Sequence, residues 1–472
     1  MEQLTGLDAA FLYLETPNAP MHIGGASIID PRTAGGRLEL ATLRDHLLSR
    51  IHTSRTFTQR LVEVPLKLGK PYWTLDEAFD IDRHLQRTQL PEPGGWKELS
   101  ALVAWEFSQP LDRDKPLWEI LLVEGLDTAS GIPPGSIALI SKIHHAAIDG
   151  ISGSEIMSAL YDPSPEPRPM PPAAPPEHEE LPTKTGLLKE SGKHLLEVPR
   201  ALSGTLGETV KGVVKSGAAW GLKHIKPPPF PFTAPRSRLN AAISKDRTWS
   251  AAILSLERIK AIRRSVDATV NDVVLAICAG ALRRYLAARD DLPEKPLVAM
   301  VPTSVRTEDE RGTMGNQVSA MLVSLATDVA DPAERLRLIH GSAIASKVHH
   351  QAIGARTLSD YSQFIPFGLA GAGARLYTRM HLAEKLRPIF NLVITNVPGP
   401  QVPLYVAGAR LLAHVGAAPL FDGMGLILAI FSYAGSLTVG ATSSREIMPD
   451  VDLFTGYLKT ALDELEAAVA TS

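Results

Sequence analysis

The stretch that decides the fold is SIALISKIHHAAIDGISGSEIMSALYD, which occupies residues 136–162. Residues 136–143 predict a strand, and residues 150–162 predict a helix opened by Ser152, with Glu155 as a capping-box partner three positions later. Sheets of α/β proteins commonly bind ligands where a strand ends and a helix begins. The sequence therefore predicts an α/β fold with a functional loop between these two elements.

The loop itself is His144-His145-Ala146-Ala147-Ile148-Asp149-Gly150. Adjacent side chains on an extended chain point to opposite sides, so the two histidines cannot both face one cleft if the strand continues through them. We expect one of them to be the chemical group and the other to support it by packing.

Three interpretations of this loop stay open from the residues alone. A metal site would use both histidines and Asp149, but neighbouring histidines on a strand diverge, and the loop holds no cysteine and no Glu-x-x-His pattern. A structural interpretation makes the histidines satisfied polar groups at a strand end. A general-base interpretation needs one imidazole of near-neutral pKa, with Asp149 fixing the loop through a basic partner and Gly150 allowing the turn.

Other catalytic signatures are missing from the sequence. It contains no Gly-x-Ser-x-Gly elbow, no Gly-x-x-x-x-Gly-Lys-Ser/Thr loop and no dinucleotide-binding fingerprint. A histidine base without an evident protein nucleophile indicates direct transfer between two bound substrates.

Length and composition limit the class of protein. The 472 residues are about three times the ~150 of a typical domain, which predicts two domains or one pseudo-duplicated body. A hydrophobic content of 44%, a charged content of 21% and a net charge of -3 exclude a disordered chain, a collagen-like fibre and a generally basic nucleic-acid binder. The single cysteine, Cys278, lies in an apolar run and predicts a buried, unreactive thiol. The N-terminus does not resemble a signal peptide, so we expect a cytoplasmic protein.

Residues 423–444 carry no charge and are numerous enough to cross a bilayer. The turn-like sequence Tyr433-Ala434-Gly435-Ser436 interrupts them, which favours a buried hairpin over a membrane helix. Residues 271–286 predict a helix that starts at Asn271.

The proline-rich residues 163–182 predict a surface crossover or linker. Residues 184–226 combine lysines with small apolar groups, which fits either a solvated helical hairpin or a basic amphipathic element that touches anionic lipid.

HHAAIDG matches the HHxxxDG motif of the CoA-dependent acyltransferase superfamily. The chain as a whole resembles the bacterial wax ester synthase/acyl-CoA:diacylglycerol acyltransferase branch of that superfamily. Four segments carry the resemblance in the family's order: LTGLDAAFLYLETPNAPMHIGG at residues 4–25, PLDRDKPLWEI at 110–120, VNDVVLAICAGALRRYL at 270–286 and TNVPGP at 395–400. Because chloramphenicol acetyltransferases and peptide-synthetase condensation domains share HHxxxDG, the first two segments are what indicate the lipid branch.

The resemblance implies two chloramphenicol-acetyltransferase-like domains with mixed sheets flanked by helices and an active-site channel between them. The division that follows places an N-terminal acyltransferase domain at 1–162 and the crossover with its basic segment at 163–235. A second, acyltransferase-like domain then occupies 236–472.

The same resemblance implies the roles of the loop residues. His145 is the general base that takes the proton from the acceptor hydroxyl, which then attacks the acyl-CoA thioester. His144 supports it, Asp149 holds the loop and Gly150 permits the turn.

Two further family motifs fall on this chain. The PLW motif, to which we assign fold or acyl-channel support, is Pro116, Leu117 and Trp118. The ND motif is Asn271 and Asp272, for which capping favours a structural role over a catalytic one.

A tetrahedral intermediate needs an oxyanion donor. Asn396 and Ser304 are candidates because each is a polar group beside a predicted strand end. Arg306 is a candidate cation for fixing Asp149.

The implied function is transfer of a long-chain acyl group from acyl-CoA, a substrate, to diacylglycerol or a long-chain alcohol, without cofactor or metal. The alternatives are an acyltransferase for an amine or polyketide acceptor, and a non-catalytic lipid-binding member of the fold. No nucleic-acid partner is expected, and the expected location is cytoplasmic, peripheral to the inner face of the plasma membrane or to lipid inclusions.

Overall fold

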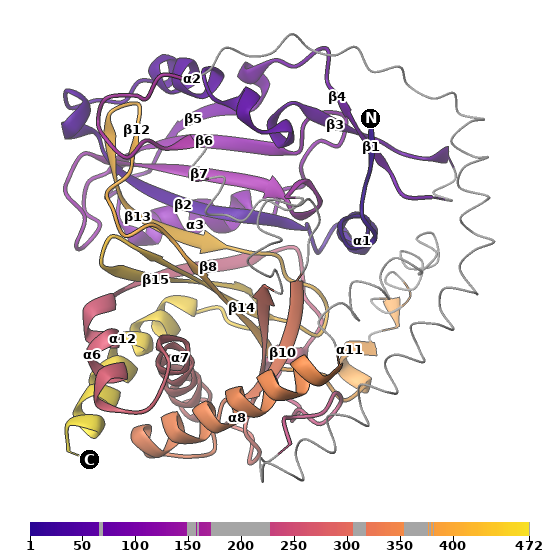
Figure 1. Ribbon diagram of the computed structural model, residues 1–472, viewed down its shortest axis with the longest axis vertical. Coiled ribbons are helices and arrows are strands. Elements are labelled where there is room, and N and C mark those ends of the chain that lie inside the picture. The colour runs from indigo at the N-terminus through magenta and orange to yellow at the C-terminus, as the bar shows by residue number, and fades with distance from the viewer. Residues whose placement is uncertain are drawn as a thin grey trace.

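The computed structural model describes residues 1–65, 69–148, 157, 160–170, 227–304, 318–353, 376, 379–380 and 382–471. Two six-stranded sheets form the body, and most of the helices lie on their outer faces (Figure 1). The predicted α/β class is confirmed.

The first sheet carries the motif strand. In spatial order its strands are β12 (Tyr405–Val406), β13 (Ala409–Ala417), β2 (His22–Asp30), β7 (Ser136–His144), β6 (Trp118–Leu126) and β5 (Leu85–Gln89). β7 pairs antiparallel with β2 and β6, and β5 runs parallel to β6, so the sheet is mixed. The strand predicted at residues 136–143 is confirmed as β7.

The second sheet lies below the first in Figure 1. In spatial order its strands are β10 (Val318–Ser324), β9 (Val298–Ser304), β11 (Leu392–Pro398), β14 (Leu426–Tyr433), β15 (Ser436–Ser444) and β8 (Arg247–Ser255). A small third sheet near the N-terminus has the order β1 (Glu2–Gln3), β4 (Tyr72–Leu75) and β3 (Gln59–Val62).

The helices are divided between the two halves. The first half holds α1 (Gly6–Leu14), α2 (Leu40–Leu48) and α3 (Trp96–Glu106), and the second holds α6 (Leu256–Ser265), α7 (Val270–Ala287), α8 (Pro332–Ile353), α11 (Leu382–Lys385) and α12 (Val451–Ala470). Short 3-10 turns are η1 (Pro31–Ala34), η2 (Ile51–Thr53), η3 (Arg55–Phe57), η5 (Ile81–Arg83), η6 (His145–Ala147) and η7 (Arg238–Asn240). No single described helix is long and apolar enough to cross a membrane, but α6 and α7, bent by 107° to each other, satisfy those criteria as a pair.

The two halves share strands. β12 and β13 come from the C-terminal part of the chain, yet β13 pairs with β2 in the first sheet. The sheets approach closely there, since a Cβ added at Gly440 of β15 would lie 1.8 Å from the carbonyl oxygen of Gly416 in β13. The first sheet therefore contains strands from both sides of the domain boundary expected at residue 236. The sequence did not predict this, because strand exchange leaves no local signal.

Residues 423–444 form the expected hairpin. β14 and β15 pair antiparallel up to Tyr433 and Ser436, and both strands are largely buried. Ala434 and Gly435 adopt φ angles of 43° and 84°, as a two-residue hairpin turn requires. The hairpin prediction is confirmed.

Helix α7 runs through the core of the second half. Cys278 is buried within it, and burial raises the pKa of its thiol to about 12, which confirms the unreactive thiol. The helix starts earlier than predicted, because the N-cap is Thr269 and not Asn271. Thr269 and Asp272 form a reciprocal capping box, which sets the helix start two residues before Asn271.

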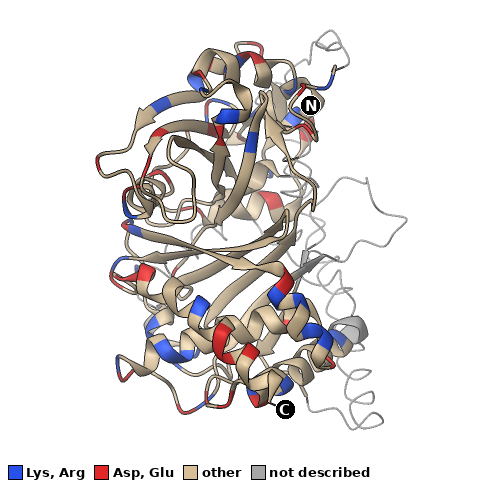
Figure 2. Ribbon diagram, turned by 90° about the vertical axis from the view of Figure 1, so that its left-hand side faces the viewer, with Lys and Arg blue, Asp and Glu red and all other residues tan. Residues whose placement is uncertain are grey.

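Charged residues lie mainly on the outer helices and on loops, whereas the strands between the two halves carry few (Figure 2). This distribution fits the burial of both sheets on the faces that meet.

Candidate active site

Strand β7 delivers the two motif histidines at its C-terminal end. The backbone N–H of His144 donates to the carbonyl of Leu117 at 2.9 Å, and that of His145 donates to the carbonyl of Met21 at 2.8 Å. The chain then turns into η6, with His144 as its N-cap. The turn leaves the strand direction immediately after His144, so the two side chains have different surroundings.

Both ring nitrogens of His144 have partners. Its Nδ1 accepts a hydrogen bond from the backbone N–H of Ala146 at 3.1 Å, and its Nε2 lies 3.0 Å from Glu15 Oε2. A nitrogen that accepts from an N–H carries no proton, so Nε2 is the protonated nitrogen and donates to Glu15. The fully buried His144 is therefore fixed in orientation and tautomer.

Glu15 holds this arrangement from the end of α1. Arg113 donates to the same carboxylate oxygen at 2.6 Å and to the carbonyl of Leu12 at 2.9 Å. Burial alone would raise the pKa of Glu15, but the hydrogen bond from His144 and the contact with Arg113 lower it to about 2. Glu15 is consequently a carboxylate at neutral pH.

His22 adds a third imidazole. It is the register partner of His144 on β2, is buried, and lies with Nε2 4.0 Å from Glu15 Oε1. Burial, followed by the proximity of His144, holds its pKa well below its usual range. His22 is thus a neutral ring that packs beside the pair.

His145 is in a different state from His144. Its ring stacks on Phe11 of α1, with centroids 3.8 Å apart and planes inclined by 15°. Its Nδ1 is buried and forms no hydrogen bond within the described part of the chain. Burial, assisted by the proximity of His144, lowers the pKa of His145 to about 4. His145 is therefore neutral at pH 7, and its pKa lies below the near-neutral value that the general-base interpretation expected.

The PLW motif packs directly against this strand end. Leu117 and Trp118 are fully buried, and the Leu117 carbonyl is the acceptor for His144 N–H. Trp118 Nε1 donates to the carbonyl of Phe57 at 2.9 Å, and the indole stacks on His84 at a centroid distance of 4.5 Å. Pro116 precedes this pair, and its carbonyl accepts from Trp118 N–H at 2.9 Å.

The ND motif lies in the second half. Asp272 Oδ2 accepts from Thr269 N–H at 2.8 Å, as a helix cap does, and lies 2.8 Å from His340 Nδ1. Asn271 Oδ1 accepts from Nδ2 of Asn396, in β11, at 3.3 Å. Asn396 makes no hydrogen bond to either motif histidine among the described residues, so the contact it shows is with Asn271.

The remaining predicted site residues cannot be placed by side chain. Asp149, Gly150 and Arg306 lie outside the described residues, and Ser304 is described only as the last backbone position of β9. Within the helix predicted at residues 150–162, Met157 and Leu160 are helical. Its predicted end is wrong, because Tyr161 is not helical and the backbone of Asp162 pairs with Tyr405.

The residues around the motif histidines that the sequence did not predict include Glu15, Arg113 and Phe11. Each lies in a segment that carries the family resemblance, residues 4–25 or 110–120. The only signal in the sequence was the presence of an acidic, a basic and an aromatic residue within those segments. Among the described residues, no group of three or more His, Cys, Asp and Glu side chains is arranged to hold a metal ion.

Two family models match the chain. The wax ester synthase/diacylglycerol acyltransferase catalytic domain matches residues 4–274, and the WS/DGAT C-terminal domain matches residues 314–466. The chain belongs to the wax ester synthase/diacylglycerol acyltransferase family. It is therefore an acyltransferase, as the resemblance implied.

Named members of the WS/DGAT family match over nearly the whole chain. A putative diacylglycerol O-acyltransferase of Mycobacterium tuberculosis is 32% identical over 98% of this chain and 90% of its own length. The O-acyltransferase WSD of Acinetobacter baylyi is 32% identical over 100% of this chain and 98% of its own length.

Solved structures agree with the fold. The wax ester synthase/diacylglycerol acyltransferase from Marinobacter aquaeolei VT8 has a TM-score of 0.68 and 31% identity, and the match covers 99% of this chain and 100% of the other. The starter condensation domain of rhizomide synthetase has a TM-score of 0.54 at 13% identity, over 99% of this chain and 94% of the other. The second match shows that the WS/DGAT fold and the condensation-domain fold are alike.

Proposed function

We propose that this WS/DGAT family member transfers a long-chain acyl group from acyl-CoA directly to the hydroxyl of diacylglycerol or of a long-chain alcohol, with His145 as the general base. The single observation that carries the base assignment is the contrast between the two motif histidines. Both nitrogens of His144 are engaged, whereas Nδ1 of His145 has no hydrogen bond in the described part of the chain.

The reaction balances without a protein nucleophile. His145 takes the proton of the acceptor hydroxyl, the oxygen attacks the thioester carbonyl, and a tetrahedral intermediate forms. The C–S bond then breaks, the new ester is released, and the thiolate of CoA takes the proton back from the imidazolium. A neutral His145 is the form that this cycle requires at its start.

The Glu15–His144–Arg113 cluster acts on His145 through the backbone. His144 Nδ1 holds the N–H of Ala146, and Glu15 holds the other side of the same ring. The residues on both sides of His145 are thereby anchored, which fixes where the base ring lies against Phe11.

Product analysis tests the proposed activity. Purified protein is supplied with palmitoyl-CoA and, in competition, dioleoylglycerol and hexadecanol, and the products are separated by thin-layer chromatography. Triacylglycerol or wax ester formed with equal release of CoA supports the proposal. If only an added amine or polyketide alcohol is acylated, the proposed acceptor class is wrong. If no acceptor leads to CoA release, the proposed reaction is rejected.

We further propose that the protein contacts an anionic lipid surface. The sequence suggested lipid contact through residues 184–226, which lie outside the described residues. Support comes instead from large exposed apolar side chains in two stretches of chain, Phe232 in one and Leu376, Met380, Leu386 and Ile389 in the other, with exposures of 56% at Phe232 and 50% at Leu386.

These two stretches carry positive charge next to their apolar groups. The guanidinium of Arg236 donates to the carbonyl of Lys385, and Lys385 Nζ donates to the carbonyl of Met380 at 3.0 Å, so the two stretches of chain are adjacent. Arg379 and Arg387 lie in the same segment. Apolar side chains flanked by cations are what anionic bilayer interfaces bind.

Vesicle co-sedimentation tests this contact. The double variant Leu386→Ser with Ile389→Ser is expected to bind phosphatidylglycerol-containing vesicles less than the unchanged protein does. The matched control is Leu453→Ser, which removes an exposed leucine from α12. Equal sedimentation of the double variant and the unchanged protein would reject this surface.

A further inference from the structure

The turn that leads into β2 lies directly beside the motif histidines. Thr16 and Ala19 close it through backbone hydrogen bonds of 3.3 and 2.9 Å, and Asn18 lies within it. Shortly after the turn, the carbonyl of Met21 accepts the 2.8 Å hydrogen bond from His145 N–H. The position of this turn therefore determines where the backbone of His145 can lie.

The turn packs in the apolar core of the second half, although it precedes the first sheet in sequence. Ala19 and Met21 are 4% and 2% exposed and belong to the same apolar cluster as Ile243, which precedes β8. Phe11, on which the His145 ring stacks, packs against this cluster and against that of the first half. The surroundings of His145 are therefore held partly from the second half.

A buried cation of the second half binds the same turn. Arg247 is the first residue of β8, and its guanidinium donates to the carbonyl of Asn18 and, at 2.5 Å, to that of Ser244. In return, Asn18 Nδ2 donates to the carbonyl of Ile243 at 3.5 Å. Hydrogen bonds thus run in both directions between the turn and the segment that leads into β8.

Arg247 keeps its charge in this position. Burial lowers its pKa to about 10, opposed by the charges of Glu446, Asp246 and Asp422. None of the described carboxylates lies within ion-pair distance of the guanidinium, so its hydrogen-bond partners there are the two backbone carbonyls. Because a charged donor makes stronger hydrogen bonds than a neutral one, Arg247 holds the turn firmly.

The segment next to Arg247 is itself fixed within the second half. Ser244 N–H donates to Oγ of Ser444, the last residue of β15, at 3.3 Å. Ser244 Oγ donates to Glu446 Oε2 at 2.6 Å. The turn is therefore bound to a part of the second half that is anchored to its sheet.

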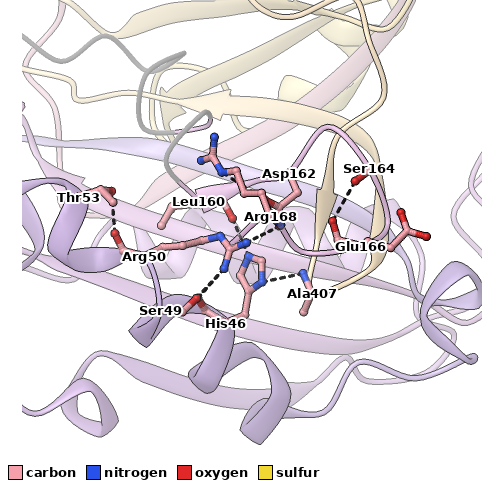
Figure 3. Close-up of polar contacts among 10 residues, drawn as sticks. All are labelled: His46, Ser49, Arg50, Thr53, Leu160, Asp162, Ser164, Glu166, Arg168 and Ala407. Carbon is pink, nitrogen blue, oxygen red and sulfur yellow. Dashed lines mark hydrogen bonds and ion pairs between the residues drawn. The ribbon is translucent and has the colours of Figure 1, made fainter. Parts of the chain in front are cut away.

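The two halves are also joined at the opposite end of β2 (Figure 3). The backbone of Asp162 pairs with Tyr405 of β12 through hydrogen bonds of 2.7 and 2.8 Å, and His46 Nδ1 accepts from Ala407 N–H at 3.2 Å. Arg50 binds Asp162 at 2.6 Å, with both side chains buried. These contacts dock the exchanged strand onto the first half.

The length of β2 separates the two connections. His22 at its start is paired with His144, and Asp30 at its end is paired with Arg410, which also pairs with Tyr405. The nine residues of β2, at ~3.4 Å per step, place these two ends about 27 Å apart. Of the two connections, the one through the turn is therefore the one that adjoins the motif histidines.

We propose that Arg247 is a positioning residue for the base His145. From the second half it holds the turn at Asn18, and the turn fixes Met21, whose carbonyl binds the backbone of His145. The proposal rests on the proposed function, in which His145 takes the proton of the acceptor. Because a misplacement of about 1 Å can lower a rate by ~10²-fold, a contact that acts only through the backbone of the base is sufficient.

Arg247→Met tests this role, because it removes the donors and keeps much of the buried volume. We expect kcat with palmitoyl-CoA and dioleoylglycerol to fall by about tenfold or more, as a displaced base requires, with the KM for palmitoyl-CoA unchanged. Arg247→Lys keeps a charged donor for the Asn18 carbonyl and is expected to recover most of the rate. An unchanged kcat in Arg247→Met, or a change confined to KM, would contradict the positioning role.

His46→Ala is the matched control, because it removes a buried contact between the two halves at the opposite end of β2. Both variants should lower the urea midpoint, but only Arg247→Met should lower the kcat of the folded protein. An equal fall of kcat in both would assign the effect to lost stability and overturn the proposal.

Asn18→Gly decides the question if Arg247→Met does not fold. It removes the bond to Ile243 and loosens the turn, but it removes no side chain from the core of the second half. It should lower kcat and leave KM unchanged, and an unchanged kcat would contradict the proposal.

A double-mutant cycle separates action through His145 from any other action. In His145→Ala the base is absent, so the addition of Arg247→Met should leave the residual rate unchanged. If the two losses multiply instead, Arg247 acts on another part of the reaction and the proposal is wrong.

The position of His145 can also be measured without acyl transfer. In protein that is isotope-labelled at its histidines, the imidazole NMR resonances of His145 are identified by their loss in His145→Ala. Arg247→Met should shift them, whereas His46→Ala should not. This result supports the proposal even if no acyl transfer is measured, and unchanged His145 resonances in Arg247→Met contradict it even if transfer is fast.

Discussion

The pair His144–Glu15 in the first half of the molecule and the pair His340–Asp272 in the second half are both histidine–carboxylate contacts, the first through Nε2 and the second through Nδ1 of the ring. The nitrogen-to-oxygen distances are 3.0 and 2.8 Å, and each carboxylate also binds a second group. In the first half that group is Arg113, and the pair orients a strand end that is followed by a second histidine. In the second half it is Thr269, and the carboxylate serves as a helix cap.

The difference teaches that a histidine beside a carboxylate does not by itself define a catalytic site. What distinguishes the first half is His145, a neutral ring held against Phe11 with an unbonded Nδ1 among the described residues. We propose that the pair next to it positions His145, whereas the carboxylate of the pair in the second half caps α7.

The largest expected effect is that of His145→Ala. Because a general base contributes ~10²- to 10⁴-fold, we expect CoA release to fall by about that factor. The measurement is the rate of CoA release with palmitoyl-CoA and dioleoylglycerol, accompanied by the urea midpoint as a check of folding. His340→Ala is the matched control and should keep most of the activity. If His145→Ala keeps more than roughly a tenth of the original rate, His145 is not the base, and the proposed difference between the two halves fails.

The next effect is on stability at acid pH. The pKa of Glu15 is lowered from an ordinary 4.5 to about 2, so its stabilising contribution is present above pH 4.5 and is lost as the pH falls towards 2. Of a total of about 3 kcal/mol, roughly 2 should disappear between pH 6 and pH 3. Urea unfolding of the unchanged protein and of Glu15→Gln at these two pH values measures the difference. Identical pH dependence in both proteins would show that Glu15 is not held as a carboxylate by His144 and Arg113.

Glu15→Gln should also reduce catalysis through His144. A hydrogen bond to a charged group contributes ~1.5–3 kcal/mol, which corresponds to roughly a tenfold or larger fall in kcat. Because Glu15 positions the base and does not bind substrate, the KM for palmitoyl-CoA should stay unchanged. Glu63→Gln is the matched control, since Glu63 is the other carboxylate bound to Arg113, at 3.3 Å. A change confined to KM would contradict the positioning role.

The smallest effect belongs to the second half. Thr269→Ala removes the N-cap of α7 and should lower the free energy of unfolding by ~1 kcal/mol. The activity of each folded molecule should not change, because the cap lies in the pair that we regard as structural. Urea unfolding and kcat are measured on the same sample to decide this. A fall in kcat larger than the unfolded fraction explains would assign the second pair a part in the reaction.

Local features of this fold were predictable from the sequence. The largely apolar stretch before His144 predicted β7, and the turn residues Ala434 and Gly435 predicted the hairpin. The different surroundings of His144 and His145 were expected from strand alternation, but they arise because β7 ends at His144 and His145 begins the turn η6. These features depend on neighbours in sequence, which is why the sequence contains them.

Features that depend on distant contacts were not predictable in the same way. Glu15 is separated from His144 by 129 positions, and no periodicity relates them. The pairing of β13 with β2 joins the two ends of the chain, and the start of α7 was misplaced because the capping box at Thr269 was overlooked. The family segments contained Glu15 and Arg113, but only the structure shows that they meet.

The most direct test of the central claim is chemical rescue of His145→Ala with imidazole, because loss of activity alone does not separate a base from a ring that packs on Phe11. The readout is triacylglycerol formed from palmitoyl-CoA and dioleoylglycerol, which excludes acyl transfer to imidazole itself. The account predicts that the rate rises with the concentration of neutral imidazole in His145→Ala and does not rise in His144→Ala. Rescue of His144→Ala in place of His145→Ala, or a rate in His145→Ala that imidazole leaves unchanged, would contradict the assignment of His145 as the base.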